Sequence, residues 1–135
     1  MTDTTAPADR AAPRFDDDDL SARLDAMSDD ERHALPFGVI GLDPAGRVRF
    51  YSRTESIQSG YGDRPILGLD FFGQVAPCLA AHDFQARLRA DQDAGQLDIE
   101  VGHTGDFADR SRFLRVRAMS AAGGGLWLAH QRPAS

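Results

Sequence analysis

The stretch FGVIGLDPAGRVRFYS, residues 37–52, decides the fold class, because it contains two strand-like segments around a tight turn. Its two halves, FGVIGLD and RVRFYS, are rich in β-branched and aromatic residues, and the letters PAG between them are typical of a turn. We expect Gly46 to adopt the left-handed conformation that such a turn requires. The segment therefore predicts an antiparallel hairpin.

Three more strand-like segments close the chain: LDIEVGH (97–103), RFLRVRAM (112–119) and GLWLAHQ (125–131). The last two are joined through SAAGGG (120–125), whose triple glycine suits a flexible hairpin and lacks the lysine and following helix of a phosphate loop. Five antiparallel strands with helices gathered on one side predict an α+β protein. Such a sheet can hold a pocket between itself and the helices.

Two helices are expected before the hairpin. The segment FDDDDLSARLDAM (15–27) places Leu20, Leu24 and Met27 about one helical turn apart. Its acidic run is expected to lie at the positive end of the helix dipole rather than to bind a metal. The letters SDDE (28–31) have capping-box spacing, so a second, short helix should follow.

That second helix is expected to run to about Ala34, since Pro36 cannot continue it. Residues 53–77 are rich in glycine and proline and predict several short helical turns. The segment HDFQARLRADQDAGQ (82–96) predicts one longer helix, which Gly95 is placed to end.

Composition limits the possible functions. The chain has 135 residues, a net charge of −6 and 15 basic residues, all of them arginine. This balance argues against a nucleic-acid surface, which needs a basic face. No apolar run is long enough for a membrane helix, and the N-terminus lacks an apolar signal core, so a cytoplasmic protein is expected. The histidines are expected to be packed or exposed rather than to bind a metal: His33, His82, His103 and His130.

Several segments together resemble the photoactive yellow protein family, whose members have the PAS fold: LPFGVIGLD, FYSRTES, LGLDFFGQVAPC and LWLAHQR. The resemblance extends from about Phe15 to Arg132 and includes RFDDDDLSARLDAM, a helical segment that ordinary PAS domains lack. It implies a five-stranded antiparallel sheet with helices on one side and an N-terminal helical cap. The implied divisions are a flexible N-terminus (1–14), the cap (15–35), a PAS core (36–132) and a tail (133–135).

The resemblance also implies a cofactor. Cys78, the only cysteine, stands directly after Pro77, at the position where the family attaches 4-hydroxycinnamic acid (p-coumaric acid) through a thioester. A thioester requires a nucleophilic thiol. On the residue type alone, a lone cysteine is more often a small apolar core residue than a nucleophile. The hypothesis that Cys78 attaches the chromophore therefore rests on the family resemblance.

Four further residues are implied to contact the chromophore. Tyr51 and Glu55 match the two residues that hydrogen-bond its phenolate oxygen, and Ser59 stands where the family often has a supporting threonine. Tyr61 stands where the family commonly has an arginine that closes the pocket. Glu55 can donate a hydrogen bond only while protonated, and burial is expected to keep it so by raising its pKa.

Two functions remain open at this point. The resemblance implies a blue-light receptor in which isomerisation, proton transfer from Glu55 and release of the cap follow illumination. The alternative is a PAS module without a covalent chromophore, which binds a small ligand or a signalling partner. No triad-like arrangement indicates an enzyme. Any output is expected to pass through an unidentified signalling protein or a homodimer.

Overall fold

The computed structural model describes residues 12–62, 65–75, 97–104 and 111–132. Its centre is one antiparallel sheet of five strands in the order β3-β2-β6-β5-β4. The last strand along the chain therefore pairs with the first. The strands are β2 (Gly38–Leu42), β3 (Val48–Tyr51), β4 (Asp98–Thr104), β5 (Phe113–Ser120) and β6 (Leu126–Gln131). The α+β class and the five-stranded antiparallel sheet are confirmed.

The predicted hairpin is present as β2 and β3. Gly46 has φ +85°, so it adopts the expected left-handed conformation. The Asp43 carboxylate fixes the turn, because its Oδ1 accepts hydrogen bonds from the backbone N–H groups of Ala45 and Arg47, both at 2.9 Å. This is local turn chemistry, which explains why the sequence predicted it.

Two short helices form the N-terminal cap, α2 (Leu20–Ala26) and α3 (Asp29–His33). Ser28 and Glu31 form the predicted capping box, with the Ser28 N–H donating to Glu31 Oε1 at 2.8 Å. The acidic run ends at Asp19, the N-cap residue of α2, so it lies at the N-terminal end of that helix, as expected. The Asp19 side chain makes no capping hydrogen bond, and no acidic residue lies in the first turn of the helix.

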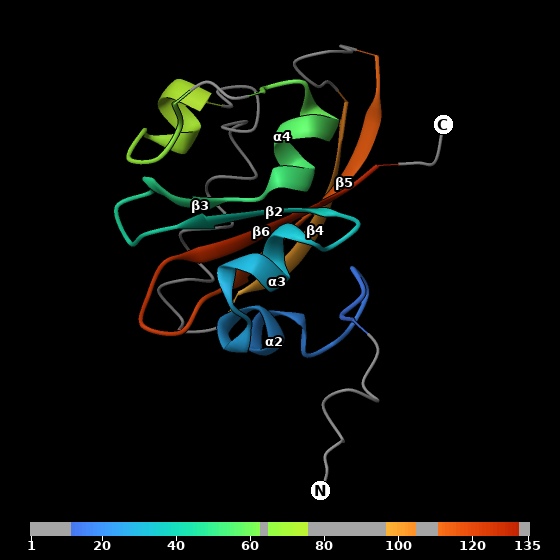
Figure 1. Cartoon of the computed structure of the whole chain (residues 1–135), viewed down its shortest axis with the longest axis vertical. Helices are drawn as coiled ribbons and strands as arrows, with labels where there is room; N and C mark the ends of the chain where they lie inside the picture. Colours follow the sequence, from blue (N-terminus) through green and yellow to red (C-terminus); the bar gives the residue numbers. More distant parts are fainter. Residues whose placement is uncertain (1–11, 63–64, 76–96, 105–110, 133–135) are drawn as a thin grey trace, which may run out of the picture.

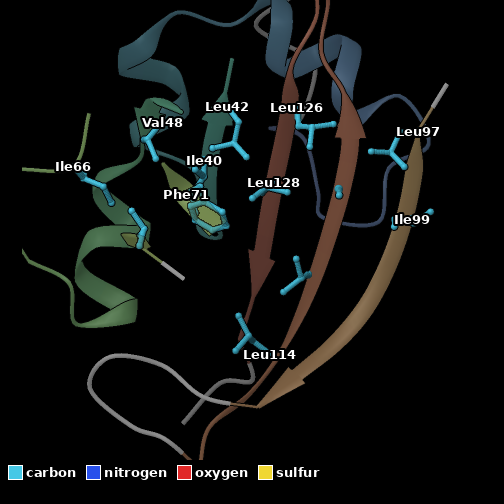
Figure 2. Close-up of a cluster of buried hydrophobic side chains, with 13 residues drawn as sticks. Ile40, Leu42, Val48, Ile66, Phe71, Leu97, Ile99, Leu114, Leu126 and Leu128 are labelled. Atoms are coloured by element: carbon cyan, nitrogen blue, oxygen red, sulfur yellow. The ribbon is translucent and has the colours of Figure 1, made fainter. Parts of the chain in front are cut away.

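The sheet separates two apolar clusters (Figure 1). Successive residues of a strand point to opposite faces, so β2 and β6 contribute to both clusters. Figure 2 shows the larger one, in which side chains of β2, β5 and β6 meet Phe71. The smaller cluster packs the cap against the opposite face: Phe15, Leu20, Leu24, Leu35, Phe37, Val39, Phe50, Met119, Ala121, Trp127 and Ala129.

The segment after β3 consists of short helical turns, as predicted. Helix α4 (Arg53–Ser59) lies on the sheet face opposite to the cap, and a single π-helical turn (Phe71–Val75) adds to the larger cluster. The longer helix expected at 82–96 falls outside the described residues. Within the described ranges, no helix has the length and apolar character needed to cross a membrane.

Candidate functional site

Helix α4 carries most of the predicted site residues, and its start is fixed by a buried serine. Ser52 is fully buried, and its Oγ accepts hydrogen bonds from the N–H groups of Val39 and Glu55, both at 3.0 Å. The second bond is an N-cap interaction, and the first ties the cap residue to β2. The helix ends at Gly60, which has φ +84°. These contacts hold Glu55 and Ser59 in place above the sheet.

The side chains of Tyr51 and Ser59 are in contact. Tyr51 ends β3, is half-buried, and its hydroxyl lies 3.3 Å from Ser59 Oγ. Ser59 is buried and also accepts the Tyr61 N–H at 3.1 Å. The Tyr61 ring lies 5.8 Å from the Tyr51 ring, and its hydroxyl donates to Pro65 O at 3.3 Å. Three of the predicted residues therefore form one continuous group.

Glu55 has different partners. It is 2% exposed, and both carboxylate oxygens bind the Arg132 guanidinium, Oε1 to Nη1 at 2.7 Å and Oε2 to Nη2 at 2.9 Å. His130 Nδ1 lies 3.0 Å from Oε2. Bidentate arginine–carboxylate pairs of this kind are among the strongest polar contacts in proteins. Glu55, His130 and Arg132 will be called the buried triad.

The position of Glu55 in the triad requires a glycine at residue 38 of β2. Gly38 pairs with His130 across β2 and β6, and a Cβ added at Gly38 would lie 1.9 Å from Glu55 Oε1. No side chain can therefore occupy this position while Glu55 keeps its place. The glycine of FGVIG is explained by this close approach rather than by an unusual backbone conformation.

The expectation that Glu55 is protonated is corrected for the ligand-free chain. Burial alone raises the pKa of this carboxyl, but His130 and Arg132 outweigh burial and lower its pKa from 4.5 to about 2. Glu55 is therefore an ionised partner of Arg132 and His130. The pKa of Tyr51 moves the other way: burial raises it most, and the Glu55 charge raises it further. Tyr51 thus keeps its proton and can donate it in a hydrogen bond.

His130 has one ring nitrogen with a partner and one without. The residue is 4% exposed. Its Nδ1 contacts Glu55, whereas Nε2 is the one buried side-chain nitrogen or oxygen in the described part of the chain that has no hydrogen-bond partner. Buried polar atoms in native proteins are nearly always paired. This unpaired nitrogen is therefore an exception among the buried polar atoms of the described residues.

The attachment residues cannot be placed. Cys78 and Pro77 lie outside the described residues, so their positions relative to Tyr51 and the triad remain predictions. A groove of about 640 Å³ is present on the cap, where Ala22, Met27 and Glu31 contribute to its wall, and none of the predicted site residues lines it. We therefore do not assign it to the chromophore.

Sequence reasoning missed both basic members of the triad. His130 was expected only to be packed or exposed, and Arg132 was not singled out. The available signal is the alternation Leu126, Leu128, His130, Arg132, which continues an apolar face of the last strand into two basic residues. Buried basic residues on such a face require an acidic partner.

Comparison with known proteins first gives the class. No protein-family model matches the chain. The PAS domain of a Colwellia psychrerythraea protein superposes with a TM-score of 0.59 at 13% identity, covering 86% of this chain and 98% of that one. The PAS domain of an HTR-like protein from Haloarcula marismortui gives 0.55 at 18% identity, covering 84% and 91%. These likenesses show the PAS fold alone.

The particular family follows from more similar proteins. The chain is 31% identical over 107 residues to photoactive yellow protein of Halochromatium salexigens, which is 79% of this chain and 86% of that protein. It is 27% identical to photoactive yellow protein of Rhodothalassium salexigens, covering 88% and 96%. The photoactive yellow protein domain of the sensor histidine kinase Ppr from Rhodospirillum centenum superposes with a TM-score of 0.74 at 30% identity, covering 83% and 99%. The chain belongs to the photoactive yellow protein family and is a PAS-fold sensor.

Proposed function

We propose that this protein is a blue-light receptor that carries a 4-hydroxycinnamoyl chromophore as a thioester on Cys78. The observation that supports this best is the shared environment of Tyr51 and Glu55. The Tyr51 hydroxyl is held by Ser59; burial raises the pKa of Tyr51 most, and the buried Glu55 charge raises it further. Both phenol-contacting positions of the family are thus filled, and both face the same buried region.

The residues present fit a phenolic group. Tyr51 would donate its hydroxyl proton to the phenol oxygen, and Ser59 Oγ orients that hydroxyl from 3.3 Å. The unpaired His130 Nε2 offers a further polar contact. When bound, the chromophore would supply light absorption and the isomerisation of its double bond. We propose that Pro77 positions the thiol and that Tyr61 lines the pocket.

Helix α4 is coupled to the cap by hydrogen bonds at its N-terminal end. The Arg53 N–H donates to His33 Nδ1 at 2.9 Å, and Thr54 Oγ1 donates to Leu35 O at 2.6 Å. Residues 33–35 leave the cap and enter β2. A change of charge around Glu55 that shifts α4 would therefore pull on the end of the cap, which is our proposed route to cap release.

The alternative function is also supported by one observation. Glu55 already has three hydrogen-bond contacts in the ligand-free chain, so the site does not need a chromophore to satisfy this carboxylate. A PAS module with an unmodified Cys78 would bind a small ligand or a partner protein through the same region. In either case we propose a non-enzymatic cytoplasmic protein whose output passes through a signalling partner or a homodimer.

The deciding experiment is reconstitution with activated 4-hydroxycinnamic acid, followed by an absorption spectrum and an intact-mass measurement. We expect a visible absorption band and a mass increase of one hydroxycinnamoyl group. The matched control is Cys78→Ala, which should give neither. An unmodified mass for the unsubstituted protein would contradict the thioester and favour the ligand-binding alternative. Adduct formation that persists in Cys78→Ala would show attachment elsewhere.

A further inference from the structure

The unpaired nitrogen of His130 lies in a defined place in the sheet. His130 is on β6, between Gly38 of β2 and Val116 of β5. Gly38 has no side chain, and Val116 is a buried apolar residue of the larger cluster. His130 contacts Glu55 of α4, and Arg132 of β6 binds the same carboxylate. Neither neighbouring strand therefore supplies a partner for Nε2 opposite His130.

The partners of Glu55 determine which nitrogen of His130 carries the proton. The carboxylate is held by two hydrogen bonds from Arg132 and can only accept a third from His130. Nδ1 must therefore be the donor in the 3.0 Å contact. In the neutral form of the imidazole, a proton on Nδ1 leaves a lone pair on Nε2. In that form the unpaired atom is a hydrogen-bond acceptor and a potential base.

We propose that His130 Nε2 binds the phenol oxygen of a phenolic ligand and accepts its proton. In that step the phenol O–H bond breaks, its electron pair stays on the oxygen, and an N–H bond forms at Nε2. The Nδ1–H group keeps its hydrogen bond to the Glu55 carboxylate. The inference rests on the proposed function only in requiring a phenolic ligand, and it requires no thioester.

This assignment gives each charge in the site a partner. The protonated imidazole would lie between the phenolate oxygen and the Glu55 carboxylate, which Arg132 already binds through two hydrogen bonds. Glu55 therefore acts as a fixed anion that positions His130, whereas family resemblance made it the proton donor. The arrangement is a carboxylate–histidine pair of the kind that orients a base.

Two substitutions separate the two ring nitrogens. In His130→Asn the amide can occupy the position of Nδ1 and keep a contact to Glu55, but nothing replaces Nε2. In His130→Gln the longer side chain can bring its amide to the position of Nε2. Both variants are made in the Cys78→Ala full-length chain, so that no adduct forms. The probes are the methyl ester of 4-hydroxycinnamic acid and its 4-methoxy analogue, measured by calorimetry.

We expect the Cys78→Ala chain to bind the hydroxy ester roughly tenfold more tightly than the methoxy analogue, the size of one net hydrogen bond to a buried group. His130→Asn should abolish this preference, and His130→Gln should retain part of it. A merely structural role of His130 would weaken both ligands equally. An unchanged preference in His130→Asn, or no binding of the hydroxy ester to the parent chain, would overturn the inference.

Nitrogen-15 NMR of the His130 ring gives an independent test that does not depend on colour or affinity. In the ligand-free chain we expect a protonated Nδ1 and an unprotonated Nε2. Adding the hydroxy ester should protonate Nε2, and adding the methoxy analogue should not. A proton on Nε2 in the ligand-free state, or an Nε2 signal unaffected by the hydroxy ester, would contradict the proposal.

The outcomes test the role of His130 separately from the proposed thioester on Cys78. Phenol-selective binding through His130 without an adduct on Cys78 would support the inference and contradict the covalent chromophore. An adduct on Cys78 together with an Nε2 signal that does not respond to the hydroxy ester would support the covalent chromophore and contradict the inference.

Discussion

The two faces of the sheet differ in the polar contacts that hold the covering helices. On the face covered by α4, the polar contact is the buried triad, in which Glu55 and Arg132 have side chains 3% and 4% exposed. On the face covered by the cap, polar contacts surround an apolar cluster and reach solvent. Asp98, the ion-pair partner of Arg117 there, has a side chain that is 50% exposed.

The cap is held mainly through backbone oxygens. Arg117 Nη1 donates to Phe15 O at 2.8 Å and to Asp17 O at 2.7 Å. On the other side of the cap, Asp25 Oδ1 accepts from Trp127 Nε1 at 2.7 Å. Arg117 and Trp127 are buried beneath the cap, 7% and 4% exposed, so lifting the cap would open these groups to water, which can replace the bonds.

This difference assigns the two faces separate roles. Breaking the triad leaves a charge in the core, so the α4 face resists partial opening. Breaking the cap contacts exposes groups that water can satisfy, so the cap can open locally while the sheet stays folded. A signal that arises beside Glu55 would therefore appear as movement of the cap.

The largest expected effect comes from removing one partner of the triad. Arg132→Met leaves the Glu55 carboxylate buried without its bidentate arginine partner, and we expect it to lower the free energy of unfolding by about 3–5 kcal/mol. Urea unfolding followed by circular dichroism measures this. The control is Arg47→Met, since that side chain is exposed and should change stability by less than about 0.5 kcal/mol. A loss below about 1 kcal/mol for Arg132→Met would show that the triad is not the strong contact of this face.

The pH dependence of stability tests the same ion pair without removing it. The pKa of Glu55 is about 2 in the folded chain against an ordinary 4.5, so its contribution is complete above pH 4.5 and is lost as the pH falls toward 2. The loss is on the order of 3 kcal/mol across that window. Unfolding of the ligand-free protein in denaturant at a series of pH values measures it. Glu55→Gln should flatten this part of the curve, and a slope unchanged by that substitution would assign the acid sensitivity to other carboxylates.

On the cap face, Arg117→Met should have a smaller and more local effect. It removes the two bonds to Phe15 and Asp17 together with the ion pair to Asp98, and we expect a loss of about 1–3 kcal/mol. Hydrogen exchange should become faster for amides of α2 and stay unchanged for those of α4. The matched control is Arg115→Met, whose partners Asp16 and Glu100 are largely in solvent and which should cost less than about 1 kcal/mol. Equal acceleration in α2 and α4 would mean that the two faces open together.

The sequence predicted those parts of the molecule that depend on neighbouring residues. The β2–β3 hairpin follows from Gly46 and Asp43, and the start of α3 follows from Ser28 and Glu31, all within a few positions of one another. The order of helices and strands was also predicted, because the apolar period changes visibly along the chain.

The triad could not be predicted in this way, because its members are far apart in the sequence. Glu55 and Arg132 are separated by 77 positions and meet only because β6 pairs with β2. Burial of Glu55 was anticipated, and by itself it does raise the pKa. The direction reversed because the two basic partners come from the last strand, and nothing in the sequence around Glu55 indicates them.

The smallest effect is expected at the capping box of α3. Ser28→Ala removes the side-chain acceptor of the Glu31 N–H and should cost about 1 kcal/mol. Because His33 at the end of α3 accepts the Arg53 N–H, fraying of α3 should also accelerate exchange of that one amide of α4. Ser28→Asp, which restores an acceptor, should reverse both changes. If Ser28→Ala frays α3 while the Arg53 amide stays protected, the coupling between the cap and α4 runs through Thr54 and Leu35 instead.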